Sequence, residues 1–191
     1  MNTDTKDVRS AIIDTASQLF YKNGYNNTGI DEILTEANIN EKTLNTYFDS
    51  KEEICLAHLK HRNEEFSKQV FSYTQQAPEG KDRILAVFNF LELFYKMEEF
   101  NGCWSVKVLS ELPPNNIVLR SEIMSQKKGL LGFIETLLVE NAQKGSKEDF
   151  KTLAQRIYLL LEGAVAQSNI HKEEWPIVQA KEMCRNLLKD F

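Results

Sequence analysis

Polar side chains that could contact DNA gather between Asn38 and Glu53, in the sequence NINEKTLNTYFDSKEE. Around the apolar Leu44 and Phe48, this stretch offers amine, amide and hydroxyl groups with little net charge: Lys42, Thr43, Asn45, Thr46 and Tyr47. Such groups hydrogen-bond to base edges and phosphates in the major groove, which is wide enough for a helix. The stretch therefore favours a DNA-contacting helix, with a solvated face of a helical bundle as the alternative.

Two flanking positions could add contacts to the DNA backbone. The expected start of the preceding helix, at Thr28 and Gly29, leaves backbone N–H groups free, and such groups bind phosphate. Lys51, at the start of the following helix, could reach a phosphate with its amine. We therefore expect one polar surface that spans residues 28–51.

One thiol stands out among three widely separated cysteines. Cys55, Cys103 and Cys184 form neither a disulfide framework nor a CxxC metal motif. Cys103 follows Gly102 at the start of a predicted short helix, where the helix dipole favours a thiolate. Cys103 is therefore a candidate reactive residue, and the alternative is an inert buried thiol. Cys55 and Cys184 carry only that second interpretation.

Metal and cofactor chemistry finds no support in the sequence. His58 and His61 lie three residues apart on one predicted helix, without a third ligand nearby in the sequence. No His–Asp constellation accompanies Cys103, which weakens the idea of a thiol-dependent enzyme. We expect no catalytic residues, no metal and no cofactor.

The elements that position these residues are expected to be helical throughout. Apolar residues recur at helical spacing, beginning with Val8, Ile12 and Ile13, and no segment shows convincing strand alternation. The spacing predicts an all-α protein of about nine helices, near residues 8–22, 28–36, 40–48, 50–73, 81–99, 103–111, 116–143, 147–169 and 174–189.

Local signals mark the ends of the first three helices. Gly24 suits the left-handed residue that closes the first helix. Thr28 is the expected N-cap of the second helix, where Asp31 would complete a capping box. Asn40 is the expected N-cap of the third helix, which is about two turns long. These lengths and short joints are typical of a helix-turn-helix unit.

Composition limits the class and the location of the protein. The chain has 191 residues, of which 42% are hydrophobic and 27% are charged, an ordinary balance for a globular protein with a proper core. No apolar run approaches the roughly 18–20 residues that cross a bilayer, and the first residues lack a secretory signal. We therefore expect a cytoplasmic protein without membrane contact.

The net charge argues against strong binding to nucleic acid. The chain carries a formal charge of −5, and residues 1–50 contain four basic against eight acidic side chains. Phosphates repel such a surface. We therefore expect few phosphate contacts and a modest affinity for non-specific DNA.

The segment 16–54, ASQLFYKNGYNNTGIDEILTEANINEKTLNTYFDSKEEI, resembles the DNA-binding domain of the tetracycline-repressor (TetR) family. Three positions depart from the family pattern: Asn38 replaces a turn Gly, Asn40 replaces a Ser or Thr, and Asn45 replaces a Tyr that contacts the DNA backbone. Asn tolerates the left-handed backbone and caps helices well, so only the third change puts a contact in doubt. The matching landmarks are Ala16, Leu19-Phe20, Gly24-Tyr25, Thr28, Ile30, Ile33, Leu34, Ala37, Thr43-Leu44, Tyr47-Phe48 and Lys51-Glu52.

The resemblance implies a division of the chain and a symmetric dimer. Residues 1–50 would form the DNA-binding domain, a fourth helix at 51–75 would connect, and residues 51–191 would form a ligand-binding and dimerisation domain. Two reading heads must meet half-sites about one helical turn (~34 Å) apart, which requires a homodimer. The candidate interface lies on the apolar stripes of the last two helices, which could instead be internal core: Ile157, Leu161, Ala164, Ile177, Cys184 and Leu188.

The region between the two ends offers a candidate effector pocket. Aromatic side chains suit a cavity for apolar ligands, although aromatics at helical spacing are more often plain core. The Gly-Cys start of the short helix also resembles a branch of the family that includes regulators responding to electrophiles or oxidants. The candidate residues are Phe88, Phe94, Tyr95, Cys103, Trp104 and Tyr158.

These patterns together predict a one-component transcriptional regulator, and more specifically a repressor. A small molecule or reactive species bound in the C-terminal domain would release it from operator DNA. The main alternative is a helical interaction module of the same fold that has lost DNA binding, which the acidic first domain and Asn45 would favour. A thiol-dependent enzyme that uses Cys103 is the weaker alternative.

Overall fold

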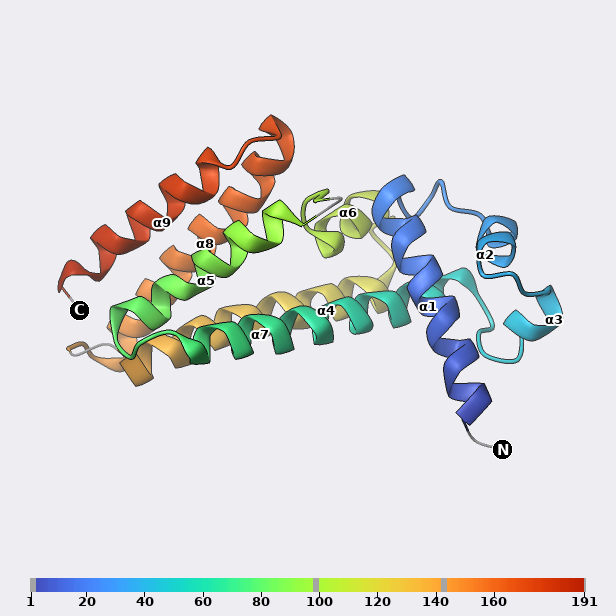
Figure 1. Ribbon diagram of the computed structural model, residues 1–191, viewed down its shortest axis with the longest axis horizontal. Coiled ribbons are helices and arrows are strands. Elements are labelled where there is room, and N and C mark those ends of the chain that lie inside the picture. The colour runs from blue at the N-terminus through green and yellow to red at the C-terminus, as the bar shows by residue number, and fades with distance from the viewer. Residues whose placement is uncertain (1–2, 98–99, 142–143, 191) are drawn as a thin grey trace. The chain divides into compact units, whose positions relative to one another are not determined.

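The computed structural model describes residues 3–97, 100–141 and 144–190, and every regular element within these ranges is helical. The predicted all-α class with about nine helices is therefore confirmed (Figure 1). The helices are α1 (Thr3–Asn23), α2 (Ile30–Glu36), α3 (Glu41–Leu44), α4 (Lys51–Gln76), α5 (Lys81–Lys96), α6 (Trp104–Glu111), α7 (Ile117–Asn141), α8 (Lys147–His171) and α9 (Trp175–Leu187), with a final 3₁₀ turn, η1 (Leu188–Asp190).

The third helix is shorter than predicted. Its regular part ends at Leu44, and the chain continues in a tighter turn, because the N–H of Thr46 donates to Thr43 O and that of Tyr47 to Leu44 O. The predicted ends of the fifth and seventh helices, at residues 98–99 and 142–143, lie outside the described residues.

The chain divides into two compact units that share two long helices. The first unit comprises residues 3–65 and 104–125, so it contains α1, α2, α3, α6 and the beginnings of α4 and α7. The second unit comprises residues 66–103 and 126–190 and contains α5, α8, α9 and the remainders of α4 and α7.

The first unit has its own apolar core. Each of its helices contributes at least one buried side chain, because each is amphipathic and would otherwise leave an apolar stripe in water. The shortest helix, α3, contributes Leu44, and the turn after it contributes Phe48. The members of this core are Ile12, Ile13, Ala16, Phe20, Ile33, Leu44, Phe48, Ile54, Cys55, Leu59, Trp104, Val108, Leu112, Leu119 and Ile123.

One imidazole is enclosed within this core. His58 on α4 is fully buried, its Nδ1 lies 2.8 Å from Ser17 Oγ, and its ring meets the Phe20 ring at a centroid distance of 5.6 Å. Its Nε2 has no hydrogen-bond partner among the described residues. Burial, together with the positive charges of Arg62 and His61, lowers the pKa of His58 from 6.5 to about 3. The imidazole is therefore neutral in the folded protein.

The buried imidazole predicts a pH-dependent stability. Between about pH 6.5 and pH 3, the unfolded chain binds a proton at His58 that the folded chain does not bind. We therefore expect the free energy of unfolding to fall as the pH drops below 6.5, with a contribution of up to about 1.4 kcal/mol per pH unit.

Urea unfolding at pH 7, 6 and 5 measures this contribution. The variant His58→Gln keeps a polar side chain near Ser17 and lacks the titrating group, so its stability should depend less steeply on pH than that of the unmodified protein. Equal slopes for the two proteins would show that protonation of His58 is not coupled to folding.

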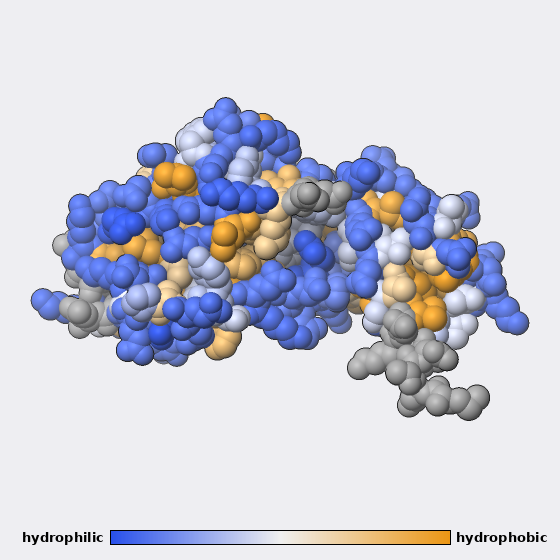
Figure 2. Space-filling view, viewed as in Figure 1, coloured by the Kyte–Doolittle hydropathy of each residue, from blue (hydrophilic) through white to orange (hydrophobic). Residues whose placement is uncertain are grey.

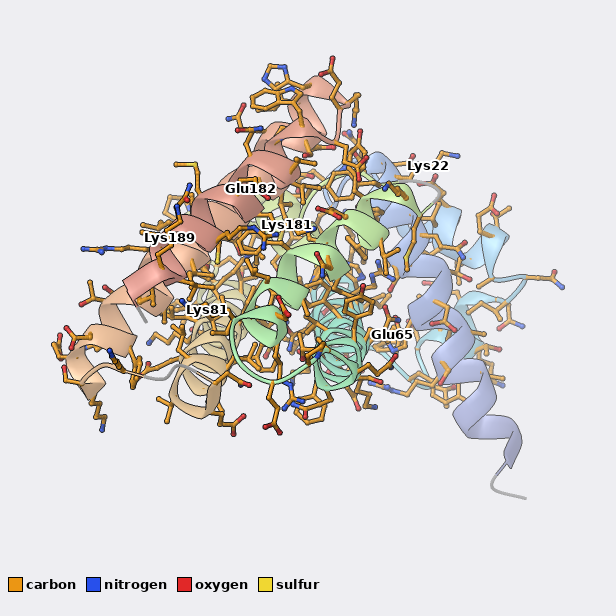
Figure 3. All side chains as sticks on the ribbon, turned by 60° about the vertical axis from the view of Figure 1, so that its left-hand side comes forward. Lys22, Glu65, Lys81, Lys181, Glu182 and Lys189 are labelled. Atoms are coloured by element: carbon orange, nitrogen blue, oxygen red, sulfur yellow. The ribbon has the colours of Figure 1, made fainter. Side chains whose placement is uncertain are left out.

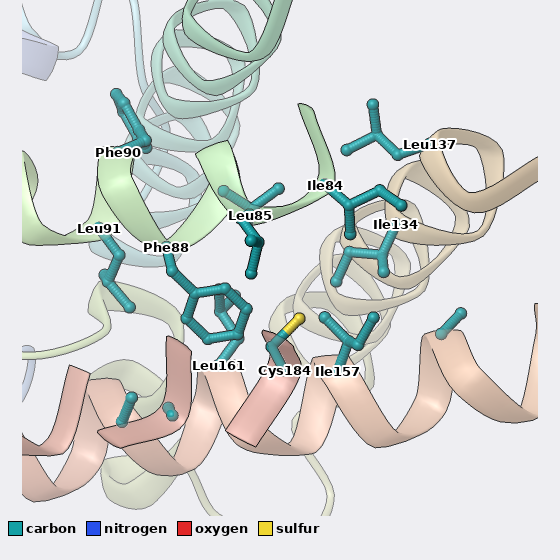
Figure 4. Close-up of a cluster of buried hydrophobic side chains, with 14 of the residues drawn as sticks. Ile84, Leu85, Phe88, Phe90, Leu91, Ile134, Leu137, Ile157, Leu161 and Cys184 are labelled. Carbon is teal, nitrogen blue, oxygen red and sulfur yellow. The ribbon is translucent and has the colours of Figure 1, made fainter. Parts of the chain in front are cut away.

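The second unit is built around a larger core, in which α5, α8 and α9 pack side by side (Figure 1). Figure 4 shows Leu85, Phe88 and Leu91 of α5 pointing towards Leu161 of α8 and Cys184 of α9. Among the described residues, polar contacts also join α5 to the C-terminal elements: Lys181 lies 3.0 Å from Glu92, Lys96 lies 2.7 Å from Glu174, and Lys81 Nζ donates to Lys189 O at 3.2 Å. Figure 3 labels Lys81, Lys181 and Lys189.

The residues predicted for the dimer interface belong to this internal core, which corrects the prediction. Within a single chain none of them is more than 5% exposed, because the stripes of α8 and α9 are covered by α5 and by each other. A side chain that its own chain encloses cannot also meet a partner subunit. The corrected residues are Ile157, Leu161, Ala164, Ile177, Cys184 and Leu188.

Candidate functional site

The turn that carries the candidate DNA-reading surface is held by two asparagines. Asn38 adopts a left-handed backbone with φ 51°, so the predicted replacement of the usual Gly is tolerated. Asn40 is the N-cap of α3: its Oδ1 accepts hydrogen bonds from Thr43 N at 2.9 Å and Thr43 Oγ1 at 3.1 Å. The predicted cap is therefore confirmed, and it satisfies a backbone donor that a one-turn helix would leave unpaired.

The polar side chains of α3 and the following turn share one surface. Lys42, Asn45 and Thr46 are exposed and, together with Glu41, line one shallow open depression. Thr46 Oγ1 donates to Lys42 O at 3.0 Å, which fixes the hydroxyl on this face. Thr43 and Tyr47 are half-buried, and Tyr47 lines a second depression with Arg9 and Lys60. The structure thus brings three predicted DNA-contacting residues together on one surface, and the contact of all five with DNA stays a prediction.

The predicted N-cap of α2 is wrong. Thr28 is fully buried, and its hydroxyl donates to Gly24 O at 2.8 Å, so it serves the C-terminal end of α1. Gly29 takes the N-cap position of α2, and no side chain caps that end. The capping box with Asp31 therefore does not form. Of the two residues predicted to bind phosphate here, only Gly29 is exposed.

Lys51 is partly engaged within its own unit. Its Nζ lies 4.6 Å from the centroid of the Tyr25 ring and donates a long hydrogen bond of 3.4 Å to Asn26 O. Burial raises the pKa of Tyr25 to about 12, with smaller contributions from Cys55 and Glu52, so its ring remains an uncharged platform for the ammonium group. The Lys51 residue is half-buried, and its amine lies at the loop between α1 and α2.

Acidic side chains of this unit gather at helix N-termini. The first turns of α2, α3 and α4 carry Asp31 and Glu32, Glu41, and Glu52 and Glu53, respectively. Negative charge in a first turn stabilises a helix through its dipole. The acidity that disfavours DNA binding therefore has a local structural reason.

The second unit places a lysine beside the candidate thiol. Cys103 is half-buried, and its Sγ lies 3.2 Å from Lys127 Nζ. Both oxygens of Glu162 accept hydrogen bonds from the same amine, at 2.7 and 2.8 Å. Burial alone would lower the pKa of Lys127, but charge on Cys103 and Glu162 and hydrogen bonds to both raise it overall. The amine therefore stays a cation beside the sulfur.

Sequence reasoning missed Lys127 and Glu162. Both interrupt otherwise apolar helix faces, and Glu162 follows three leucines directly, which is a signal that could have been noticed. What remained hidden is that α7 and α8 bring the two residues together, 35 positions apart in the chain. Tyr158, one turn before Glu162, has a pKa raised by burial and by the nearby Glu162, so it is neutral.

The aromatic residues predicted to contact an effector are packed in several ways, and their contact with a ligand stays a prediction. Phe88 is fully buried in the core next to Cys184 (Figure 4). Phe94 and Tyr95 both pack their rings against Phe100, at centroid distances of 6.0 and 5.0 Å. Trp104 belongs to the first unit, where the Arg62 guanidinium lies 5.6 Å from the centroid of its ring.

An open groove of about 420 Å³ runs along α4 and α5 in the second unit. Its lining combines apolar and polar side chains, a mixture that suits an amphipathic ligand. The sequence did not point to it, because no single helix carries the whole lining. The lining residues are Lys68, Gln69, Ser72, Tyr73, Gln76, Phe90, Leu93 and Met97.

Metal and membrane features are absent from the described part of the chain. No group of three metal-binding side chains comes together there, and His61 is instead paired with Asp14 at 3.2 Å and Glu65 at 3.5 Å. Within the same residues, no helix combines the length and the apolar character that crossing a bilayer requires.

The surroundings of the three thiols predict selective alkylation. Burial raises the pKa of Cys55 and of Cys184 from 9.0 to about 12 each, so neither is a thiolate near neutral pH. We expect iodoacetamide to modify Cys103 first in the native protein, as measured by peptide mass spectrometry over time.

A matched pair of lysine variants tests the cause of this selectivity. Lys127→Met removes the cation beside the sulfur and should slow the alkylation of Cys103 several-fold. Lys128→Met removes an exposed neighbouring charge and should leave the rate nearly unchanged. Equal rates in both variants would contradict the assigned role of Lys127.

Comparison with known proteins agrees with the helix-turn-helix geometry. Residues 12–57 match the bacterial regulatory proteins of the tetR family. Over 98% of both chains, the sequence is 27% identical to the HTH-type transcriptional repressor NemR of Escherichia coli K12. It is 23% identical to the fatty acid metabolism regulator protein of Bacillus subtilis, over 93% of this chain and 91% of the other.

Solved structures share the fold along the whole chain. A TetR-family transcriptional regulator from Streptomyces coelicolor superposes with a TM-score of 0.87 at 21% identity, covering 100% of this chain and 96% of the other. The reduced form of E. coli NemR superposes with a TM-score of 0.83 at 23% identity, covering 94% and 96%. Residues 12–57 therefore match the DNA-binding domain of the tetR family, and the fold along the chain is the one that these solved TetR-family regulators share.

Proposed function

We propose that this regulator is a homodimeric repressor that holds operator DNA through the exposed face of α3. The observation that carries the proposal is the convergence of Lys42, Asn45 and Thr46 on one surface, held by the Asn40 cap and by the burial of Leu44. A surface of amide, hydroxyl and amine groups on a helix end matches the donors and acceptors of the major groove. The similarity to the repressor NemR over nearly the whole chain supports repression rather than activation. Such a regulator acts in the cytoplasm.

The proposed dimer forms through the outer faces of the last two helices. On α8, four exposed positions follow helical spacing on one side: Leu159, Gly163, Ala166 and Ile170. The small residues between the two exposed aliphatic ones would allow a second helix to approach closely. Apolar side chains of α9 are exposed as well, among them Val178 and Met183. On the face that Figure 2 shows, apolar patches interrupt a mostly hydrophilic surface.

The proposed effector acts on the second unit, as a small molecule or as a reactive species. The thiol of Cys103, with the Lys127 ammonium 3.2 Å away, supports an electrophile or oxidant as the signal. The groove along α4 and α5 supports an amphipathic small molecule instead. In either case the effector must bind the two conformations of the dimer with different affinity, and about 1–3 kcal/mol of coupling is typical.

Replacement of Thr46 and Tyr47 by alanine tests the reading face. Each lost base contact costs about 1–3 kcal/mol, so we expect the double variant to bind its own upstream operator at least tenfold more weakly. The measurement is a fluorescence anisotropy titration, with circular dichroism as a check on folding.

Thr35→Ala is the matched control. Thr35 is an exposed threonine on α2 whose hydroxyl also donates to the carbonyl four residues earlier, at 2.8 Å. This variant should retain its operator affinity. If the double variant binds as tightly as the control while folded, the reading face has been assigned to the wrong residues.

Substitution of two leucines on α8 distinguishes residues of the proposed dimer interface from residues of the core. Leu159 is 68% exposed in the single chain, so Leu159→Glu should leave the fold intact and convert the dimer to monomer in sedimentation velocity. Leu161 is 3% exposed, so Leu161→Ala should lower the free energy of unfolding by about 2–5 kcal/mol. A Leu159→Glu protein that remains dimeric would rule out this face.

The second candidate function is an interaction module of the same fold without DNA binding. It is favoured by the acidity of residues 1–50 and by Asn45 in place of a tyrosine. A lack of binding to its own upstream DNA at low salt, without effector, would support this candidate over the repressor.

A further inference from the structure

A carboxylate from a distant part of the first unit holds the loop between α1 and α2. Glu111, the last residue of α6, accepts hydrogen bonds from the backbone N–H of Tyr25 at 3.2 Å and of Asn26 at 2.6 Å. In the opposite direction, the side-chain amide of Asn26 donates to Glu111 O at 3.1 Å. Three hydrogen bonds therefore join positions that are 85 and 86 residues apart in the chain.

The loop is shaped to receive this carboxylate. Gly24 has φ 96°, a left-handed conformation that turns the next two N–H groups towards the same side. A Cβ atom at Gly24 would lie only 2.7 Å from Glu111 Oε1, so the carboxylate occupies the space that a side chain would need. The glycine and the glutamate thus fit each other.

The position of Glu111 is unfavourable by local rules. Negative charge at the C-terminal end of a helix opposes the helix dipole, and α6 has no basic residue in its last turn. Hydrogen bonds to an ionised acceptor are about twice as strong as neutral ones, which offsets this cost. A residue that breaks a local rule while satisfying two backbone donors elsewhere is a candidate for a functional role.

Lys51 touches the same loop. Its Nζ lies against the Tyr25 ring and donates to Asn26 O, so the two loop residues that Glu111 holds are also the two that Lys51 contacts. Lys51 is the residue at the start of α4 that we assigned to the DNA backbone. The loop therefore links a carboxylate at the end of α6 to a cation of the proposed DNA surface.

We propose that Glu111 is a positioning residue for DNA binding: it fixes the loop at residues 24–26 and through it the amine of Lys51. This inference rests on the proposed repressor function. Glu111 itself does not touch DNA. Its role is to keep a phosphate contact of Lys51 preorganised, in a unit whose acidic composition offers few others.

The sign of the effect distinguishes positioning from simple electrostatics. Removal of a negative charge from a DNA-binding unit should by itself strengthen binding, because phosphates repel carboxylates. Positioning requires the opposite result for Glu111. Glu36 is an exposed carboxylate at the end of α2 in the same unit, so Glu36→Ala serves as the matched control.

The experiment measures operator affinity and its salt dependence for the full-length dimer. Glu111→Ala should bind about tenfold more weakly than the unmodified protein, whereas Glu36→Ala should bind equally well or slightly better. Glu111→Gln keeps one oxygen that can accept from the loop, so it should recover part of the loss.

A double-mutant cycle with Lys51 measures the salt dependence of operator binding, which a loss of stability alone would not change. Loss of one phosphate contact lowers the slope of log K against log salt by about one. Lys51→Met and Glu111→Ala should each lower the slope by this amount, and the combined variant should lower it no further. Amide hydrogen exchange at Tyr25 and Asn26 should become faster in Glu111→Ala with or without DNA.

The outcomes separate this inference from the function on which it rests. If the unmodified protein binds no upstream DNA, both the proposed repressor function and this inference are contradicted. If the unmodified protein binds and Glu111→Ala binds with the same affinity and the same salt slope, only the positioning role is overturned. The positioning role is also overturned if the combined variant lowers the salt slope by the sum of the two single decreases.

Discussion

The burial of Leu44 and Phe48 is the constraint on which the proposed DNA-reading surface depends. A helix of a single turn cannot persist by itself, because its few internal hydrogen bonds do not offset the cost of ordering its backbone. α3 exists because these two side chains are enclosed, with 3% exposure each, and because Asn40 supplies the first backbone partner. The polar residues between them face outward as a consequence. The proposed reading surface is therefore a consequence of core packing.

The first unit combines an acidic composition with a proposed partner that is a polyanion. The structure gives a reason for part of this acidity: many carboxylates of the first unit lie in the first turns of helices, where they stabilise the fold. Binding must then depend on a few well-placed groups rather than on a broad positive field. The contact of Glu111 with the loop at residues 24–26 fits this requirement. When few cations are present, each contributes more to DNA affinity if its position is fixed before binding.

The second unit contains a polar cluster in surroundings that are otherwise apolar. Lys127 and Glu162 are each about one-fifth exposed, and they neutralise each other at hydrogen-bonding distance. A half-buried pair of this kind is costly if one partner is lost, because the remaining charge is left without compensation. Cys103 shares the same amine, so any chemical change at the sulfur also changes the environment of the ion pair. A connection between thiol chemistry and packing is therefore built into this unit.

The sequence by itself determined the helical class, the turn at Asn38 and the cap at Asn40, because these follow from spacing and from the chemistry of single residues. The role of Thr28, the covering of the stripes on α8 and α9, and the meeting of Lys127 with Cys103 were decided only by the tertiary structure. An apolar stripe shows that a helix face is covered, but its pattern is the same whether the cover comes from its own chain or from a partner. A polar side chain likewise has several possible partners in the sequence, and only the packing of distant helices selects one of them.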